Sequence, residues 1–186
     1  MQLGDSKMQI LIVLIALAVL IAVLRVLRDK KIGRIATLIA VAVHFALIMY
    51  FAFLSRGIKE ISGFRFALPP PFVQAIIRGW FGTVAIRSLL NLLMFVPLGY
   101  LVPLIIDHYS NERSYSKPKS KPPIKFIFII LIGLGVSLSI ETAQYFFRCG
   151  VFEIDDLVKN TLGAAVGWFL YCLFNSIQLR KEKSTD

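Results

Sequence analysis

Six polar side chains lie within twenty residues near the end of an otherwise apolar chain. They occupy the stretch ETAQYFFRCGVFEIDDLVKN and are Glu141, Gln144, Arg148, Asp155, Asp156 and Asn160. On a helix, offsets of three and seven residues place the first three of them on one stripe. Carboxylate, amide and guanidinium groups gathered in this way can bind a polar headgroup, or transfer a proton if one carboxyl group is kept protonated.

A second polar stripe follows on the next predicted helix. Asp156, Asn160, Gly163 and Gly167 superimpose within roughly 40° under helical periodicity. The GxxxG spacing of the two glycines allows two membrane helices to approach closely. This face is therefore expected to pack against the stripe that carries Glu141, in an antiparallel hairpin. The paired aspartates at the start of this helix are also candidates for its N-terminal cap.

A third segment supplies polar groups at the matching end of the predicted bundle. Arg87 and Asn91 are four residues apart and share one helical face. Pro97 and Gly99 follow within NLLMFVPLGYLVP, where a membrane helix can kink and still satisfy its backbone through neighbouring helices. All three segments are thus predicted to bring polar side chains to the same leaflet.

The composition places these residues in a membrane. Of the 186 residues, 57% are hydrophobic and 17% are charged, which departs from the balance of soluble domains. Five apolar runs are long enough to cross a hydrocarbon core of roughly 30 Å, which takes about 20 helical residues. They are residues 8–27, 35–54, 88–106, 126–147 and 157–174. The predicted fold is an all-α polytopic membrane protein, a bundle of five transmembrane helices in a single domain over residues 1–186.

Lys and Arg set the predicted orientation, because loops rich in these residues stay in the cytoplasm. Thirteen of the 21 basic residues lie in three clusters, at 25–34, 107–125 and 178–186. All three clusters are cytoplasmic if the N-terminus is outside and the C-terminus is inside. The first run is interpreted as a retained helix, because its basic cluster follows the apolar segment and no small-x-small cleavage site appears. The net charge of +10 then reflects attraction to anionic lipid headgroups, and no nucleic-acid partner is expected.

The segment 55–87 carries five further basic residues on the predicted outer side. Three consecutive prolines at 69–71 interrupt any helix that enters it. The stretch FVQAIIRGWF that follows, residues 72–81, mixes aromatic and polar side chains. Two interpretations fit it equally: a short helix lying in the outer interface, or a connector packed over the bundle.

An acid inside a membrane helix needs a partner. Glu141 would cost about 2.5–3.5 kcal/mol at the centre of such a helix, so it is expected to face a partner or a wet cavity. Arg148 is the local candidate for an ion pair. No metal or cofactor is expected, because no Cys/His spacing supports a site. His44, Cys149 and Cys172 are left out of the predicted site.

Two blocks of the sequence carry a resemblance to a known family. They are NLLMFVPLGYLVP at 91–103 and ETAQYFFRCGVFEIDDLVKNTLGAAVG at 141–167. The chain resembles the VanZ-like family, membrane proteins whose name comes from glycopeptide (teicoplanin) resistance. The pattern is an Asn, F-x-P-x-G, E-x-x-Q, an Arg, D-x-x-N and two glycines. It falls on Asn91, Phe95, Pro97, Gly99, Glu141, Gln144, Arg148, Asp156, Asn160, Gly163 and Gly167. Related sequences often have Asp where this chain has Glu153.

The resemblance implies a role in the bacterial cell envelope at the outer face of the membrane, without implying a reaction. The first hypothesis is a membrane protein that reduces sensitivity to teicoplanin-type glycopeptides by binding the headgroup of a membrane lipid or of a lipid-linked cell-wall precursor. The predicted ligand-binding residues are Asn91, Glu141, Gln144, Arg148, Asp155, Asp156, Asn160 and Arg87. The predicted packing residues are Pro97, Gly99, Gly163 and Gly167.

Two alternatives remain open beside that hypothesis. The first is a membrane enzyme acting on a phosphorylated isoprenoid lipid, with Glu141 as general acid or base and Asp156 as its partner. The second is a purely structural bundle, in which an ion pair, helix caps and a glycine seam hold the helices together. The sequence leaves the ligand, any catalysis or transport and the oligomeric state undetermined.

Overall fold

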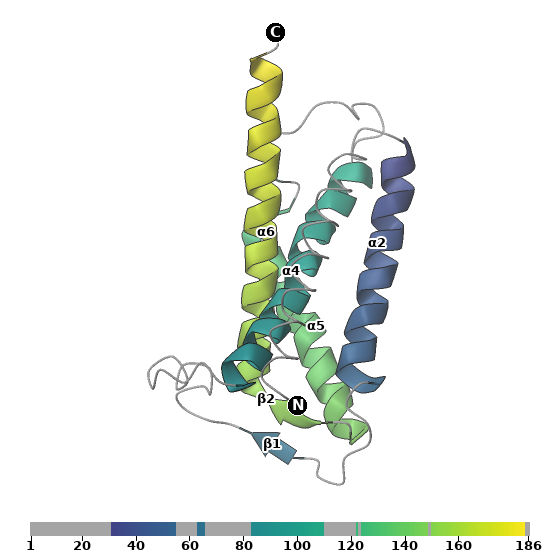
Figure 1. Cartoon of the computed structure of the whole chain (residues 1–186), viewed down its shortest axis with the longest axis vertical. Coiled ribbons are helices and arrows are strands. Elements are labelled where there is room, and N and C mark those ends of the chain that lie inside the picture. The colour runs from purple at the N-terminus through teal and green to yellow at the C-terminus, as the bar shows by residue number, and fades with distance from the viewer. Residues whose placement is uncertain are drawn as a thin grey trace.

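The computed structural model describes residues 31–54, 63–65, 83–109, 122, 124–148 and 150–184. These residues form helix α2 (Lys31–Met49), a π-helical segment η1 (Tyr50–Leu54), strand β1 (Gly63–Arg65), helices α4 (Thr83–Tyr109) and α5 (Phe126–Phe146), strand β2 (Val151–Glu153) and helix α6 (Ile154–Lys183) (Figure 1). The predicted all-α class is confirmed in its main features, because two three-residue strands are the only β-structure within the described residues.

Three helices of the described part are long and apolar enough to cross a membrane, by length and composition. They are Ser88–Asp107, Phe126–Phe146 and Ile154–Gln178, and they correspond to the third, fourth and fifth predicted spans. In the second predicted span the apolar α-helix is shorter, Ile35–Met49, and it continues into the π-helical turns of η1. The first predicted span, 8–27, lies outside the described residues. The count of five spans therefore stays a prediction.

One end of the molecule gathers the two strands, the ends of α2 and α5, and the starts of α4 and α6 (Figure 1). We call it the strand end. The helices α4 and α6 run away from it in the same direction, whereas α2 and α5 run towards it. The short connection between α5 and α6 therefore closes an antiparallel hairpin, as the sequence predicted, and the polar residues on both helices meet at the strand end.

Glycines set the close contact between α4 and α6. A Cβ atom at Gly163 would collide with the carbonyl oxygen of Leu92, and one at Gly167 would collide with that of Val96. Gly99 on α4 meets the backbone of α6 in the same way. Backbones this close require residues without a side chain at the contact. The helix that faces the two α6 glycines is thus α4, and not α5 as the sequence analysis expected.

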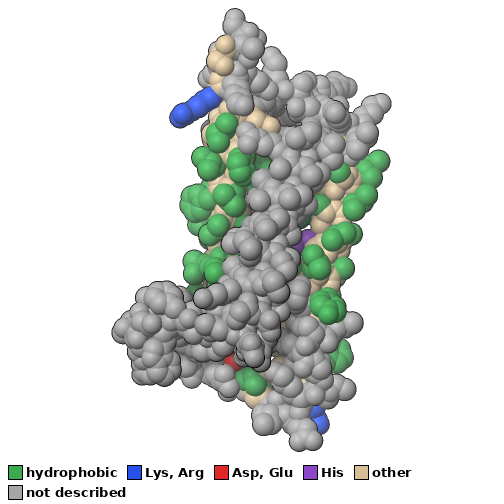
Figure 2. Space-filling model, viewed as in Figure 1, with side chains coloured by type: hydrophobic (Ala, Val, Ile, Leu, Met, Phe, Trp, Pro, Cys, Tyr) green, Lys and Arg blue, Asp and Glu red, His purple; other side chains and the backbone are tan. Residues whose placement is uncertain are grey.

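Helix α5 packs on the other side of α6 and leaves most of its surface uncovered. Gly133 lies against the Cβ atom of Ala164, and the indole Nε1 of Trp168 donates a hydrogen bond to the carbonyl oxygen of Ile124 at 3.2 Å. Large hydrophobic side chains cover the remaining faces of α5 and the outer faces of α2 and α6, and those of α2 and α6 are visible in Figure 2. Exposed apolar surface on this scale indicates contact with lipid.

The described core consists of two clusters along α4. Near the strand end, Phe95 is fully buried in a cluster that joins α2, η1, α4 and α5. Farther along, Tyr100 packs in a second cluster that joins α2, α4 and α6. Pro97 and Pro103 lie inside α4, which continues through both of them as one helix. The α4 helix is thereby held on three sides and positions the start of α6.

The strands form a parallel two-stranded sheet that the sequence analysis did not predict. Gly63 pairs with Val151, Phe64 with Phe152 and Arg65 with Glu153. Strands of three residues are too short to show an alternating pattern in the sequence. The sheet fixes part of the segment 55–87 at the strand end. The stretch 72–81, with its two open interpretations, lies outside the described residues.

Candidate functional site

Eight buried polar side chains gather at the strand end, and we call them the strand-end cluster. Each is at most 8% exposed. They come from α4, α5 and α6 and are Ser88, Ser137, Glu141, Gln144, Asp155, Asp156, Lys159 and Asn160. Five of the eight were predicted site residues, so the structure brings together most of what the sequence analysis selected.

Glu141 lies on the buried face of α5 and is 2% exposed. Its Oε2 accepts a hydrogen bond from the backbone N–H of Glu153 at 3.0 Å. Because Glu153 ends β2 and directly precedes α6, this bond ties the short sheet and the start of α6 to α5. The predicted partner Arg148 is absent from this contact.

Arg148 lies outside the helical stripe that the sequence analysis predicted. The α-helix ends at Phe146, and Arg148 takes a left-handed backbone conformation with φ of 54°. Such a conformation is common just after a helix ends, and it stops the 100° progression that defined the stripe. The Arg148 side chain is exposed, and no ion pair joins it to Glu141 in the described part of the chain. The predicted Glu141–Arg148 pair is therefore wrong.

Gln144 is 1% exposed and makes a contact that no sequence pattern suggested. Its Nε2 donates a hydrogen bond to the backbone carbonyl oxygen of Ala52 at 3.1 Å. Ala52 lies in η1, the π-helical end of the second helix. Carbonyl groups near a helix end lack partners within the helix, and in lipid such a group must find one elsewhere. Gln144 thus joins α5 to the end of α2 and η1.

Asn160 links α6 to α5 at one turn deeper than Glu141. Its Nδ2 donates a hydrogen bond to the hydroxyl oxygen of Ser137 at 2.9 Å. Asn160 is 4% exposed, and its Oδ1 has no hydrogen-bond partner among the described residues.

Lys159 is the basic residue of the cluster, and the sequence analysis missed it. Its Nζ lies 2.9 Å from Asp155 Oδ2 and 2.5 Å from Asp156 Oδ1, and it donates to the Ser88 hydroxyl at 3.5 Å. The spacing of three and four residues from the two aspartates was a signal that could have found it. Both aspartates lie in the first turn of α6, where carboxylates also favour the positive end of the helix dipole.

The cluster carries more negative than positive groups. Two buried carboxylates, of Asp155 and Asp156, contact the single buried ammonium group of Lys159, and Glu141 is a third buried carboxylate among the described side chains of the cluster. Two oxygen atoms of the cluster, Asp155 Oδ1 and Asn160 Oδ1, have no hydrogen-bond partner among the described residues. A buried acceptor without a donor costs free energy, so these atoms mark positions where a donor from outside the described chain is favoured.

The remaining predicted residues lie outside the cluster or outside its contacts. Asn91 is half-buried one turn further along α4 from the start of the cluster. Arg87 belongs to the first turns of α4, and its side chain lies outside the described residues, as does Cys149. Cys172 is a half-buried free thiol, and His44 is buried on α2 with its Nε2 unpartnered. No three metal-ligating side chains meet within the described ranges.

Comparison with known proteins gives two matches. The profile of the VanZ/LLP1 family matches residues 10–175. Protein VanZ of Enterococcus faecium is 28% identical over 92 residues, which cover 50% of this chain and 48% of that protein. The matched part thus spans about half the length of this curated relative. No solved structure matches the chain.

Proposed function

The chain belongs to the VanZ/LLP1 family, and on that premise we propose that it is a multi-pass protein of the bacterial cell membrane that lowers sensitivity to teicoplanin-type glycopeptides. In this proposal the strand-end cluster binds the headgroup of a membrane lipid or of a lipid-linked cell-wall precursor. Binding at the outer face withholds that headgroup from the antibiotic, or changes the surface on which the antibiotic gathers.

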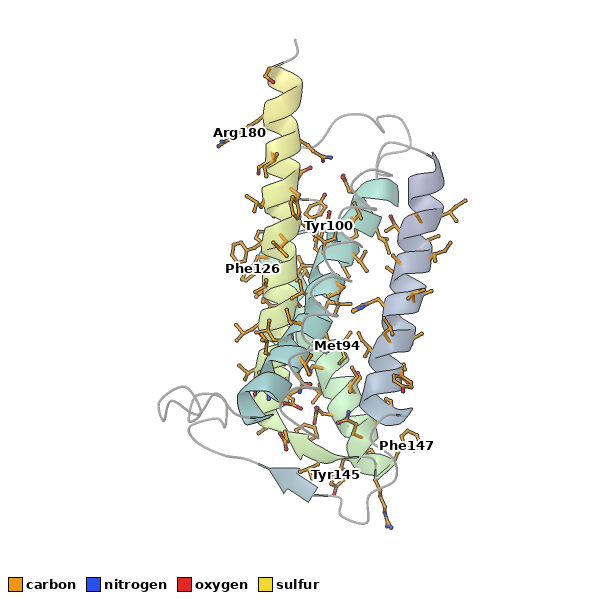
Figure 3. All side chains as sticks on the ribbon, viewed as in Figure 1. Met94, Tyr100, Phe126, Tyr145, Phe147 and Arg180 are labelled. Carbon is orange, nitrogen blue, oxygen red and sulfur yellow. The ribbon has the colours of Figure 1, made fainter. Side chains whose placement is uncertain are left out.

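The position of the strand end supports an outer location. Helix α4 ends and helix α5 begins at the opposite end, on either side of the basic segment 107–125, and the last turns of α6, with their basic residues, lie at that end too (Figure 1). Arg180 is exposed near that end (Figure 3). Since basic segments favour the cytoplasm, the strand end faces outward. In a variant without native cysteines, an external thiol reagent is expected to label a cysteine at position 57 and to miss one at position 119.

The observation that carries the binding proposal is the pair of unpartnered oxygen atoms, Asp155 Oδ1 and Asn160 Oδ1. Both side chains are more than nine-tenths buried, in a cluster that already contains an excess of carboxylates. A purely structural cluster gains nothing from acceptors that lack donors, because their desolvation is not compensated. Ionisable residues inside membrane helices are expensive, and function is the usual reason for keeping them.

A structural role is the second candidate, and three contacts favour it. Glu141 contacts β2, Gln144 contacts η1 and Asn160 contacts α5, each by hydrogen bonding. An enzymatic role for Glu141 is less favoured, because a general acid or base must reach its substrate. The Glu141 carboxylate already accepts a hydrogen bond from the backbone N–H group of Glu153, which engages it in holding β2.

Antibiotic sensitivity separates the binding role from the structural role. The variants Glu141→Gln and Asp156→Asn keep the shape and an acceptor oxygen at each position while removing charge. Expressed in a sensitive bacterium, both are expected to accumulate in the membrane like the unmodified chain and to lose its protection against a teicoplanin-type antibiotic. Asp107→Asn, at a buried carboxylate in the opposite half of the bundle, is the matched control and is expected to retain protection. If both cluster variants protect fully, the binding proposal is wrong and the cluster is structural.

A further inference from the structure

We propose that the strand-end cluster recognises a primary ammonium group on a lipid headgroup, rather than the phosphate group. This inference rests on the proposed function, which leaves the chemistry of the headgroup open. The sequence analysis included two basic residues, Arg148 and Arg87, among the predicted ligand-binding residues. The structure assigns a different balance of charge to the site.

The charge of the cluster favours a cation. The carboxylates of Asp155 and Asp156 face the one ammonium group of Lys159, so this part of the cluster carries an excess of negative charge among the described side chains. Opposite charges attract more strongly where water is excluded than in bulk water. A phosphate group entering the cluster would add negative charge to an existing excess, whereas an ammonium group would reduce that excess.

The unpartnered atoms are hydrogen-bond acceptors and call for a donor. The amide of Asn160 is oriented by its donation to Ser137, which leaves Oδ1 free to accept. Asp155 uses Oδ2 to contact Lys159 and leaves Oδ1 free. A primary ammonium group carries three N–H donors, and a phosphate diester carries none. A trimethylammonium group has the charge without the donors, so it provides a direct test of which property matters.

Lys159 shows that this part of the helix accommodates a primary ammonium group. Its Nζ sits between two carboxylates from the first turn of α6 and also reaches a hydroxyl of α4. A headgroup ammonium would be held by the same kind of contact, through the acceptor oxygen that Asp155 leaves free. The cluster lies at the ends of the membrane-crossing helices, which is the depth at which lipid headgroups are found.

Competition among three lipids in native mass spectrometry tests the inference. The purified full chain is incubated with equal amounts of phosphatidylethanolamine, phosphatidylcholine and phosphatidylglycerol that carry the same acyl chains. Phosphatidylethanolamine is expected to be retained about tenfold or more over each of the others, the effect of one charge-assisted hydrogen bond. Asp155→Asn is expected to lower this preference, and Asp107→Asn to leave it unchanged.

The outcomes separate this inference from the proposed function. Equal retention of phosphatidylethanolamine and phosphatidylcholine, or a preference for phosphatidylglycerol, overturns ammonium recognition and leaves headgroup binding standing. Retention of no lipid by the unmodified chain overturns both. If Asp155→Asn does not fold, Asn160→Asp replaces it: this variant adds a negative charge and keeps a free acceptor, so it should raise or preserve the preference for the amine lipid. A shift of that variant towards phosphatidylglycerol overturns the inference.

Discussion

The two halves of the α4–α6 interface share one packing geometry and differ in their polar contents. At the strand end Lys159 reaches Ser88, and its ammonium is surrounded by carboxylates. In the other half the Tyr171 hydroxyl donates a hydrogen bond to Asp107 Oδ2 at 3.2 Å, and the ring of Tyr100 lies edge-on to that of Tyr171, with centroids 6.0 Å apart. Figure 3 labels Tyr100 in the upper half and Tyr145 and Phe147 at the strand end.

The difference between the two halves indicates which polar groups the packing of α4 against α6 requires. Among the described residues, the far half buries the carboxylate of Asp107, which accepts a hydrogen bond from the Tyr171 hydroxyl, and beside it Tyr100 packs edge-on against Tyr171 and Phe174. The strand end buries three carboxylates and leaves Asp155 Oδ1 and Asn160 Oδ1 without a donor. Since both halves are joined by the same pair of helices, close packing alone does not explain the charges of the strand end.

The largest effect is expected from a substitution at the glycine contact, because it would disrupt both halves of the α4–α6 interface. Gly163→Leu places a side chain where the Leu92 carbonyl lies, and backbone cannot move aside as a flexible side chain does. The variant is expected to be lost from the membrane, as judged by accumulation and by size-exclusion chromatography after extraction. Gly135→Leu is the matched control, because nothing lies within 4 Å of a Cβ atom at Gly135. Normal accumulation of Gly163→Leu would show that the close glycine contact between α4 and α6 is not needed for folding.

The next effect concerns the strand end alone. Lys159→Met leaves two buried carboxylates without their ammonium partner, and it is expected to reduce the free energy of unfolding by about 3–5 kcal/mol. Neutralising the aspartates in the triple variant Lys159→Met, Asp155→Asn, Asp156→Asn should recover part of this loss. Denaturant unfolding in detergent micelles measures both variants. A single variant as stable as the unmodified chain would mean that the carboxylates are not charged against Lys159.

Two substitutions of Glu141 are expected to have smaller effects, and they separate the role of its acceptor oxygen from the role of its charge. Glu141→Leu leaves the N–H group of Glu153 without an acceptor, and the expected loss is about 1–3 kcal/mol in the free energy of unfolding. Glu141→Gln keeps an acceptor oxygen and a similar volume, so its stability is expected to equal or exceed that of the unmodified chain. Parallel unfolding curves test the pair. A Gln variant as unstable as the Leu variant would show that the charge itself holds β2.

The smallest effects compare one interhelical hydrogen bond in each of the two halves. Ser137→Ala removes the acceptor of Asn160 at the strand end, and Tyr171→Phe removes the donor to Asp107 in the far half. Each is expected to cost about 0.6 kcal/mol, the average for interhelical hydrogen bonds in a membrane. Thermal unfolding of the two variants side by side measures the difference. A cost for Tyr171→Phe as large as that of Lys159→Met would remove the contrast between the halves.

The long helices and the polar stripes could be predicted from local patterns in the sequence. The predicted span 126–147 and the observed helix Phe126–Phe146 differ by one residue, because a long apolar run must be helical if its backbone is to be satisfied in lipid. The stripe with Glu141 and Gln144 was also correct, since helical periodicity is a local property. Lys159 was within reach of the same reasoning, because its partners Asp155 and Asp156 lie four and three residues away.

The contacts across the bundle depend on tertiary packing and could not be predicted from local patterns. Gln144 bonds to a carbonyl 92 residues away, and Lys159 reaches a hydroxyl 71 residues away. Arg148 leaves its stripe because the helix ends two residues before it, and Gly163 faces α4 rather than α5. The physical reason is that periodicity fixes the face on which a side chain lies, whereas its partner is selected by the packing free energy of segments that are distant in the sequence.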